Sequence, residues 1–248
     1  MSPAGPTPEN SRIRRTLNLH SPHRTPLFAL WLIMALALIW PRTSQAAEPA
    51  CCGPITAQGQ KLLHALDQSG VEHLWLPQVH VHWLSGEPDL RRPGKSRHAT
   101  HCSAYVAAMP VRLGVPLLRP PQHRAGMLAT PQARWLGSNG KQEGWVAVDM
   151  QQAQSLANQG QFVLAAWANP DPRRSGHIAI VRPSAQSTTH LRLHGPELTM
   201  AGHLNALRIS TARGFEDHKG AWRENGKGTL QYFAHPVDWA LLNTSGTK

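Results

Sequence analysis

The chain has 248 residues, of which 41% are hydrophobic and 16% charged, and its formal net charge is +11. This composition is typical of a globular protein, and no internal repeat or low-complexity tract follows the N-terminal leader, which excludes repeat and disordered classes. Without residues 1–47, which hold five Arg and one Glu, 20 basic and 13 acidic residues remain, a net charge of +7 (20 − 13).

The N-terminal segment predicts export. Arg12, Arg14 and Arg15 precede an uncharged apolar run over 27–40, which is 14 residues long (40 − 27 + 1). That length suits the core of a signal peptide and is short for a membrane span of about 20 residues. We expect residues 1–47 to be a signal peptide and the protein to be periplasmic or secreted. In the alternative, the run stays uncleaved and anchors the protein to the inner membrane; no other membrane contact is expected.

Residues 48–248 are long enough for one domain with a sizeable core. Cys51 and Cys52 are adjacent, so they bridge each other only with strain, and staying reduced or pairing with another chain is equally expected. The patterns predict the following elements in chain order: a helix over 55–66, a strand-like alternation over 79–83, a loop over 85–97, a helix over 127–136, and a capped helix over 149–158.

The segment around Cys102 predicts a nucleophile. Thr100 is a suitable N-cap, which puts Cys102 in the first turn of an apolar helix that ends at Pro110 or near Gly114. Free backbone N–H groups and the helix dipole at this position favour a thiolate, so we expect a lowered thiol pKa. The alternative is a small apolar side chain on a core helix.

A second segment predicts a general base. A buried strand over 162–167 is followed by a turn, and Gly176 then precedes His177 and another apolar strand over 178–181. An isolated histidine of this kind is often a core residue. Beside a candidate thiol nucleophile, His177 is the expected proton acceptor.

A cysteine at a helix start followed by Gly-His and an apolar strand resembles the NlpC and CHAP groups of papain-like cysteine hydrolases. The resemblance covers about 96–233, and it implies an α+β fold in which the nucleophile helix packs on an antiparallel sheet. The chain departs from common members of these groups in its long stretch between Cys102 and His177, so we expect an insertion at about 115–160, after a helical N-terminal part. Cys102 would be the nucleophile and His177 the base of an amidase or endopeptidase acting on peptidoglycan stem peptides.

The resemblance also implies a third polar residue on the strand after His177. Asn205 and His203 share a face if 198–205 is a strand, and Asn205 is the first choice because its carbonyl oxygen fixes the imidazole tautomer. His101 and His98 are candidates for cleft lining or oxyanion donation. Trp83 and Trp145 are candidates for a substrate groove.

Two other classes of function remain open. One is a non-catalytic module on the same fold that binds cell wall or protein. The other is a metal-dependent hydrolase, since His80 and His82 share a strand face and His98 and His101 flank Cys102. No His-Glu-x-x-His or Cys-x-x-Cys motif occurs, so we expect no metal and no cofactor. The scattered basic residues fit an anionic cell-wall polymer, and no nucleic-acid-binding signature occurs. The sequence gives no indication of an oligomeric state.

Overall fold

The computed structural model describes residues 50–96, 99–124 and 128–245, which belong to one compact unit, 47–248. The expected signal segment and His98 lie outside the described residues. No helix within the described ranges is long and apolar enough to cross a membrane.

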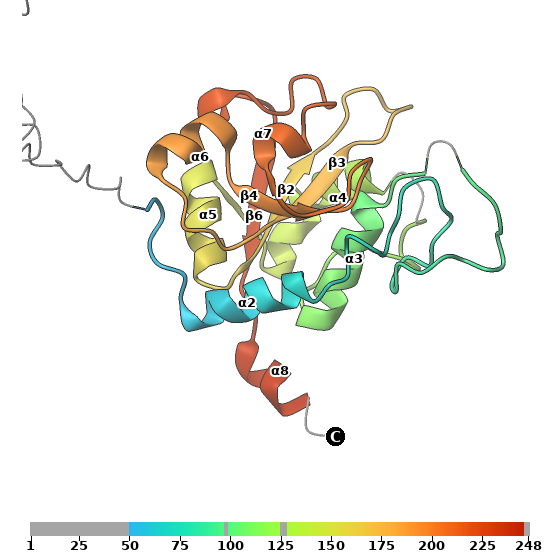
Figure 1. The fold of residues 1–248 in the computed structure, drawn as a ribbon, viewed down its shortest axis with the longest axis horizontal. Helices are drawn as coiled ribbons and strands as arrows, with labels where there is room; N and C mark the ends of the chain where they lie inside the picture. Colours follow the sequence, from blue (N-terminus) through green and yellow to red (C-terminus); the bar gives the residue numbers. More distant parts are fainter. Residues whose placement is uncertain (1–49, 97–98, 125–127, 246–248) are drawn as a thin grey trace, which may run out of the picture. The chain divides into compact units, whose positions relative to one another are not determined.

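A single antiparallel sheet of six strands organises this unit, in the order β1-β6-β2-β3-β4-β5 (Figure 1). Together with the helices it confirms the α+β class expected from the sequence. The strands are β1 (Val146–Val148), β2 (Phe162–Trp167), β3 (His177–Val181), β4 (Glu197–Met200), β5 (Ala206–Ser210) and β6 (Gln231–His235).

The helices connect and cover these strands. They are α2 (Ala57–Asp67), α3 (Cys102–Leu113), α4 (Ala129–Leu136), α5 (Met150–Asn158), α6 (Thr188–His194), α7 (Thr211–Gly214) and α8 (Trp239–Ser245), with short 3-10 turns at Asn139–Glu143 and Glu224–Gly226. The segment expected as an insertion, 115–160, supplies the edge strand β1 together with α4 and α5.

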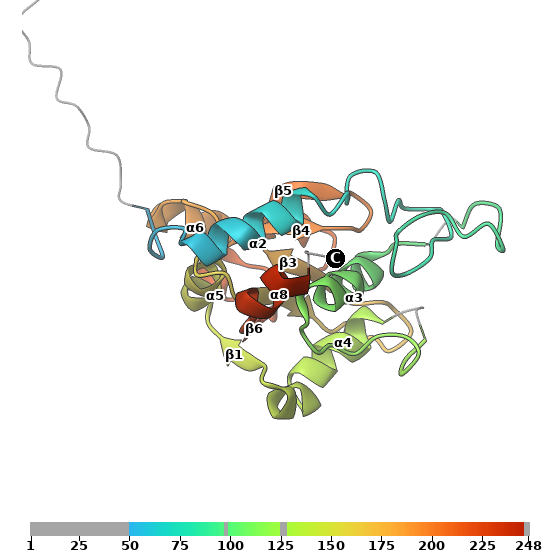
Figure 2. The same ribbon diagram turned by 90° about the horizontal axis from the view of Figure 1, so that it is seen from below.

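Each face of the sheet has its own apolar core. Alternate residues of β3 separate the two cores, because successive side chains of a strand point to opposite faces. Ile178 and Ile180 pack with α3 and α4, whereas Ala179 and Val181 pack with α5. Figure 2 shows the same division, with α3 and α4 on one side of the strands and α5 and α6 on the other.

Helix α3 is almost entirely buried, and Gly114 ends it in the left-handed conformation (φ 68°). Pro110 lies inside the helix, so the second of the two expected ends is the observed one. The prediction of Thr100 as N-cap is wrong: His101 is the N-cap, and its side chain makes no capping hydrogen bond. The backbone of His101 has not yet reached helical angles (φ −126°, ψ 24°), so the helix begins one residue later than expected.

The predicted capping box is confirmed at α5. The Asp149 carboxylate accepts the N–H of Gln152 at 2.7 Å, and the Gln152 side chain accepts the N–H of Asp149 at 3.0 Å. At the other end of α5, the Asn158 amide donates to the carbonyl oxygens of Gly53 and Ser184. It thereby ties the start of the described chain to the segment that follows β3.

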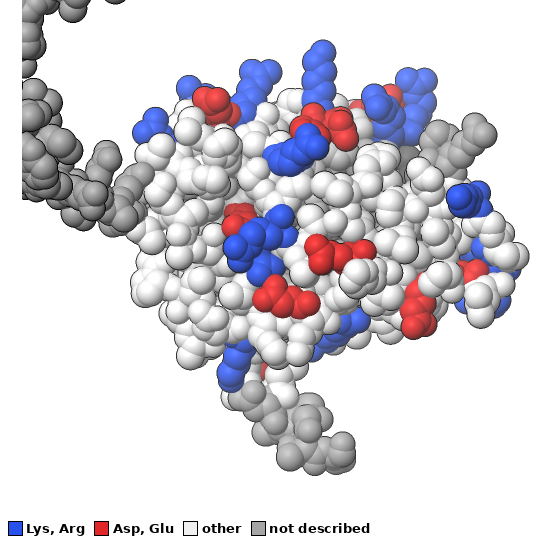
Figure 3. All heavy atoms as spheres, viewed as in Figure 1, with Lys and Arg blue, Asp and Glu red and all other residues white. Residues whose placement is uncertain are grey.

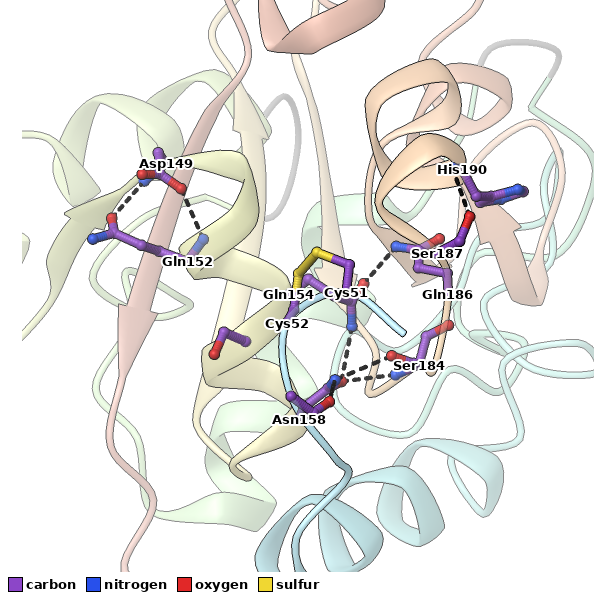
Figure 4. The surroundings of a disulfide bond; sticks show 12 residues. Cys51, Cys52, Asp149, Gln152, Gln154, Asn158, Ser184, Gln186, Ser187 and His190 are labelled. Carbon is purple, nitrogen blue, oxygen red and sulfur yellow. Dashed lines mark hydrogen bonds between the residues drawn. A yellow bond between two sulfur atoms is a disulfide. The ribbon is translucent and has the colours of Figure 1, made fainter. Parts of the chain in front are cut away.

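The same region holds a disulfide between the adjacent cysteines Cys51 and Cys52 (Figure 4). This resolves the alternatives left open by the sequence. The N–H of Cys51 donates to the carbonyl of Gln186 at 2.7 Å, so the disulfide is held beside the N-terminal end of α6. Cys102 is the one free cysteine of the described residues.

Two strand expectations are wrong. Residues 79–83 form only isolated bridges, Val79 with Lys95 and Val81 with Pro88, because their partners lie within one irregular loop and not in the sheet. The expected strand over 198–205 ends at Met200, because the chain turns there into the short loop that leads back to the antiparallel strand β5.

Charged side chains are dispersed over the surface. On the face seen in Figure 3, basic and acidic side chains lie near one another and most of the surface is uncharged. This dispersal agrees with the absence of long basic clusters in the sequence.

Candidate active site

Cys102 opens α3 and is enclosed by the core, with 4% of its surface exposed. Burial is the main influence on its thiol and raises the pKa to about 11, although the backbone N–H groups of Ile178, Ser103 and Cys102 itself act in the opposite direction. The expected lowering of the pKa is therefore wrong for this conformation. Desolvation of the thiolate outweighs the helix N-terminus.

His101, the residue before Cys102, is anchored by its side chain. Nε2 of His101 donates to the carbonyl of Val79 at 2.7 Å, and burial lowers the pKa of this imidazole. His101 therefore links the start of α3 to the irregular loop over 77–96, and its bonded nitrogen cannot serve as an oxyanion donor.

His177 is the first residue of β3, and its side chain is buried (4% exposed). The imidazole stacks on that of His218, with ring centroids 4.7 Å apart and planes 18° apart, and meets the ring of Phe215 edge-on. Burial, with contributions from His218 and His203, lowers the pKa of His177 to about 3. Within the described ranges, Nε2 of this ring has no hydrogen-bond partner.

The imidazole of His177 lies over one face of β3, whereas the thiol of Cys102 lies beside the backbone of Ile178. The N–H of Ile178 faces the sulfur of Cys102, and the Ile178 side chain belongs to the core that contains α3. Strand alternation turns the preceding His177 toward Phe215, which belongs to the other core. Among the described residues no hydrogen bond joins Cys102 and His177, although the Cys102 thiol lies beside the residue that follows His177.

A pocket of about 740 Å³ opens over the imidazole. Thr100, two residues before Cys102, lines the same pocket as His177, so the cavity extends from the imidazole toward the N-terminus of α3. Its wall contains apolar side chains (Trp167, Met200) and charged groups of both signs. The charged side chains are Asp171, Arg174, Arg213, Glu216, Asp217 and Lys219.

The two candidates for the third residue lie on the loop between β4 and β5. The Asn205 amide donates to the carbonyls of Val71 (2.8 Å), Leu74 (2.8 Å) and Trp75 (3.2 Å), and its oxygen accepts the N–H of Gly202. These bonds use the amide to brace the loop after α2, so the prediction that Asn205 orients the imidazole is wrong here. His203 is exposed and lines the pocket.

The candidate groove residues belong mainly to the core. Trp145 is 1% exposed and donates from Nε1 to the carbonyl of Pro116, which makes it a core residue and not a groove wall. Trp83 is half-buried and packs against the core that contains α3. Within the described part of the chain, no group of three or more His, Cys, Asp or Glu residues is arranged to hold a metal ion.

Sequence reasoning missed His218, Phe215 and Trp167 as neighbours of His177. Trp167 pairs with His177 in the register of β2 and β3, so the strand pattern contained a signal for that contact. His218 and Phe215 follow α7, and no local pattern brings that segment to the start of β3.

The chain matches no protein-family model, and no curated protein is significantly similar to it.

Proposed function

We propose that this protein is a cysteine hydrolase that cleaves a peptide or amide bond, with Cys102 as nucleophile and His177 as general base. The observation that carries the proposal is the contact between the sulfur of Cys102 and the N–H of Ile178. It brings the only free thiol of the described residues next to the residue that follows His177, a buried imidazole whose Nε2 has no hydrogen-bond partner among those residues. A buried polar group without a partner calls for a ligand, a water or a catalytic role.

The reaction follows from these two groups. His177 takes the thiol proton, and the sulfur attacks the carbonyl carbon of the substrate. The proton passes to the leaving amine, and water then hydrolyses the thioester to release the acid and restore the thiol. Backbone N–H groups at the start of α3 are suited to stabilise the oxyanion.

In this conformation the thiol of Cys102 and the imidazole of His177 are both neutral at pH 7. Burial raises the pKa of Cys102 and lowers that of His177, so the proton stays on sulfur. Proton transfer requires the imidazole to rotate about its Cα–Cβ bond from the pocket side of β3 toward the thiol. We infer that this arrangement is the resting form of the enzyme.

The proposed substrate class is the stem peptide of peptidoglycan. It is supported by the family resemblance of the two motifs, by the expected export and by the basic character of the chain. A pocket wall with both signs of charge suits a peptide that carries amino and carboxylate groups.

A second candidate is a non-catalytic module that binds cell wall or protein through the same pocket. Two observations favour it: among the described residues no hydrogen bond joins the thiol and the imidazole, and burial raises the thiol pKa. The two candidates predict different roles for Cys102, because binding in the pocket does not require the sulfur.

Incubation of the purified protein with muropeptides, followed by mass spectrometry, tests the proposal. New products should form with the wild type and with a Cys51→Ser/Cys52→Ser control, and should be absent with Cys102→Ala. Binding without cleavage that survives Cys102→Ala would establish the second candidate instead.

A further inference from the structure

The ring of His218 contacts two other rings at the start of β3. It stacks on His177 at 4.7 Å, and the ring of Trp167 lies 5.3 Å from it on a tilted plane. Phe215 closes the group, with its centroid 4.7 Å from His177 and 6.0 Å from His218. Three of the four side chains also line the pocket: Trp167, His177 and His218.

The backbone holds His218 in this position. Its N–H donates to the carbonyl of Phe215 at 3.0 Å, and its own carbonyl accepts the N–H of Ala221 at 2.9 Å. The ring is half-buried, so one side contacts His177 while another borders the pocket. A molecule that enters the pocket therefore meets His218 at the stack.

We propose that His218 is a positioning residue for His177: the stack keeps the His177 imidazole on the pocket side of β3, and a substrate segment that displaces His218 frees it to turn toward Cys102. This inference rests on the proposed function and describes how that site is regulated.

The step that follows is a simple proton transfer. Once the ring has turned, the S–H bond of Cys102 breaks and an N–H bond forms on the imidazole of His177, which leaves a thiolate beside an imidazolium. Other groups surround this pair of rings. His203 lowers the pKa of both His177 and His218. On His218, Asp217 raises the pKa and Arg174 lowers it.

Alkylation of Cys102 by iodoacetamide reports directly on this proton transfer, because the thiolate is the reactive form. The rate would be measured by peptide mass spectrometry between pH 5 and 9, without reductant so that the Cys51–Cys52 disulfide stays closed. The variants are His218→Ala, which removes the stack; His218→Phe, which keeps an aromatic ring without charge; and the double variant His177→Phe/His218→Ala.

We expect His218→Ala to label at least about tenfold faster than wild type at pH 7, with a new inflection in the pH range where histidine titrates. His218→Phe should label as slowly as wild type, and the double variant should lose the acceleration. Equal rates for wild type and His218→Ala would overturn the proposal. So would an acceleration that persists in the double variant, because it would mean that the core had merely loosened.

Circular dichroism establishes that each variant is folded, and His218→Gln replaces His218→Ala if the latter is not. The outcome is independent of the muropeptide assay. An acceleration that depends on His177, without cleavage of any muropeptide, would retain the positioning role and reject the hydrolase. Cleavage of a muropeptide without the faster alkylation would retain the hydrolase and reject the positioning role of His218.

Discussion

The guanidinium of Arg182 donates to the carboxylate of Asp67 at 2.7 Å and so joins the end of β3 to the last residue of α2. The same side chain is 3% exposed, lies 3.3 Å from Glu197 and donates to the hydroxyl of Thr199 and the carbonyl of Leu207. Residues from separate segments of the chain thus contact the guanidinium of Arg182. The arrangement makes Arg182 a structural centre at the opposite end of β3 from the pocket.

Replacing Arg182 should therefore destabilise the protein strongly. Arg182→Met removes the donor to the Thr199 hydroxyl and one of the two donors to the Leu207 carbonyl, and it takes the buried cation from Asp67 and Glu197. Breaking a buried ion pair typically costs about 3–5 kcal/mol. Arg208→Met is the matched control, because Arg208 also pairs with Glu197 but is 67% exposed, and it should cost less than about 1 kcal/mol. Urea denaturation measures both; equal losses would contradict the prediction.

Asn205→Ala should lower stability, because the amide donates to the carbonyls of Val71, Leu74 and Trp75. Loss of these bonds leaves buried acceptors unpaired, at a cost of about 1–3 kcal/mol. The exposed neighbour His203 serves as control, and His203→Ala should change the free energy of unfolding by less than about 0.5 kcal/mol. A stable Asn205→Ala that lost only activity would restore the catalytic role expected from the sequence.

Gly59→Ala should also be costly, although Gly59 lies within α2 and alanine is the better helix former. A Cβ at this position would collide with the carbonyl oxygen of Asn158, so α2 and α5 would have to move apart. Gly137→Ala is the control, since its Cβ would have no contact closer than 3.7 Å. Thermal unfolding should show a lower Tm for Gly59→Ala and little change for Gly137→Ala.

Acid should destabilise the protein before the carboxylates titrate. The pKa of His177 is about 3 in the fold and about 6.5 when the chain is unfolded, so the unfolded state binds the proton first. The stabilisation from this residue is complete above about pH 6.5 and is lost progressively as the pH falls toward 3. His101 and His218 have lowered pKa values as well and act in the same direction.

The free energy of unfolding, measured in urea between pH 7 and 4.5, checks this expectation. His177→Phe should reduce the slope of stability against pH by at most about 1.4 kcal/mol per pH unit, the limit for one proton. An unchanged slope would mean that His177 is accessible to protons in the folded protein.

Local signals in the sequence predicted a substantial part of this fold. The capping residues of α5, the continuous apolar run of β2 and the strand that opens at His177 are each determined within a few neighbouring residues. Residues 79–83 alternate like a strand, but whether they find a sheet partner depends on a distant segment, and here they do not.

The candidate site was predictable only in part for the same reason. The pattern places Cys102 at a helix start and His177 at a strand start, and both positions are correct. Alternation along β3 requires Ile178 and His177 to face opposite ways, but which of the two faces α3 depends on how the helix packs. The proximity of His218 depends on the path of the chain after β5, far along the sequence from His177.

β3 is hydrogen-bonded between β2 and β4, with Trp167 opposite His177 and Thr199 opposite Ile180. A slip of one residue would exchange His177 and Ile178 between the faces and turn every apolar side chain of the strand toward the wrong core. The register of β3 is therefore fixed by its two neighbouring strands. The direction in which the imidazole of His177 points therefore depends on the torsion angles of its own side chain and not on the register of the strand.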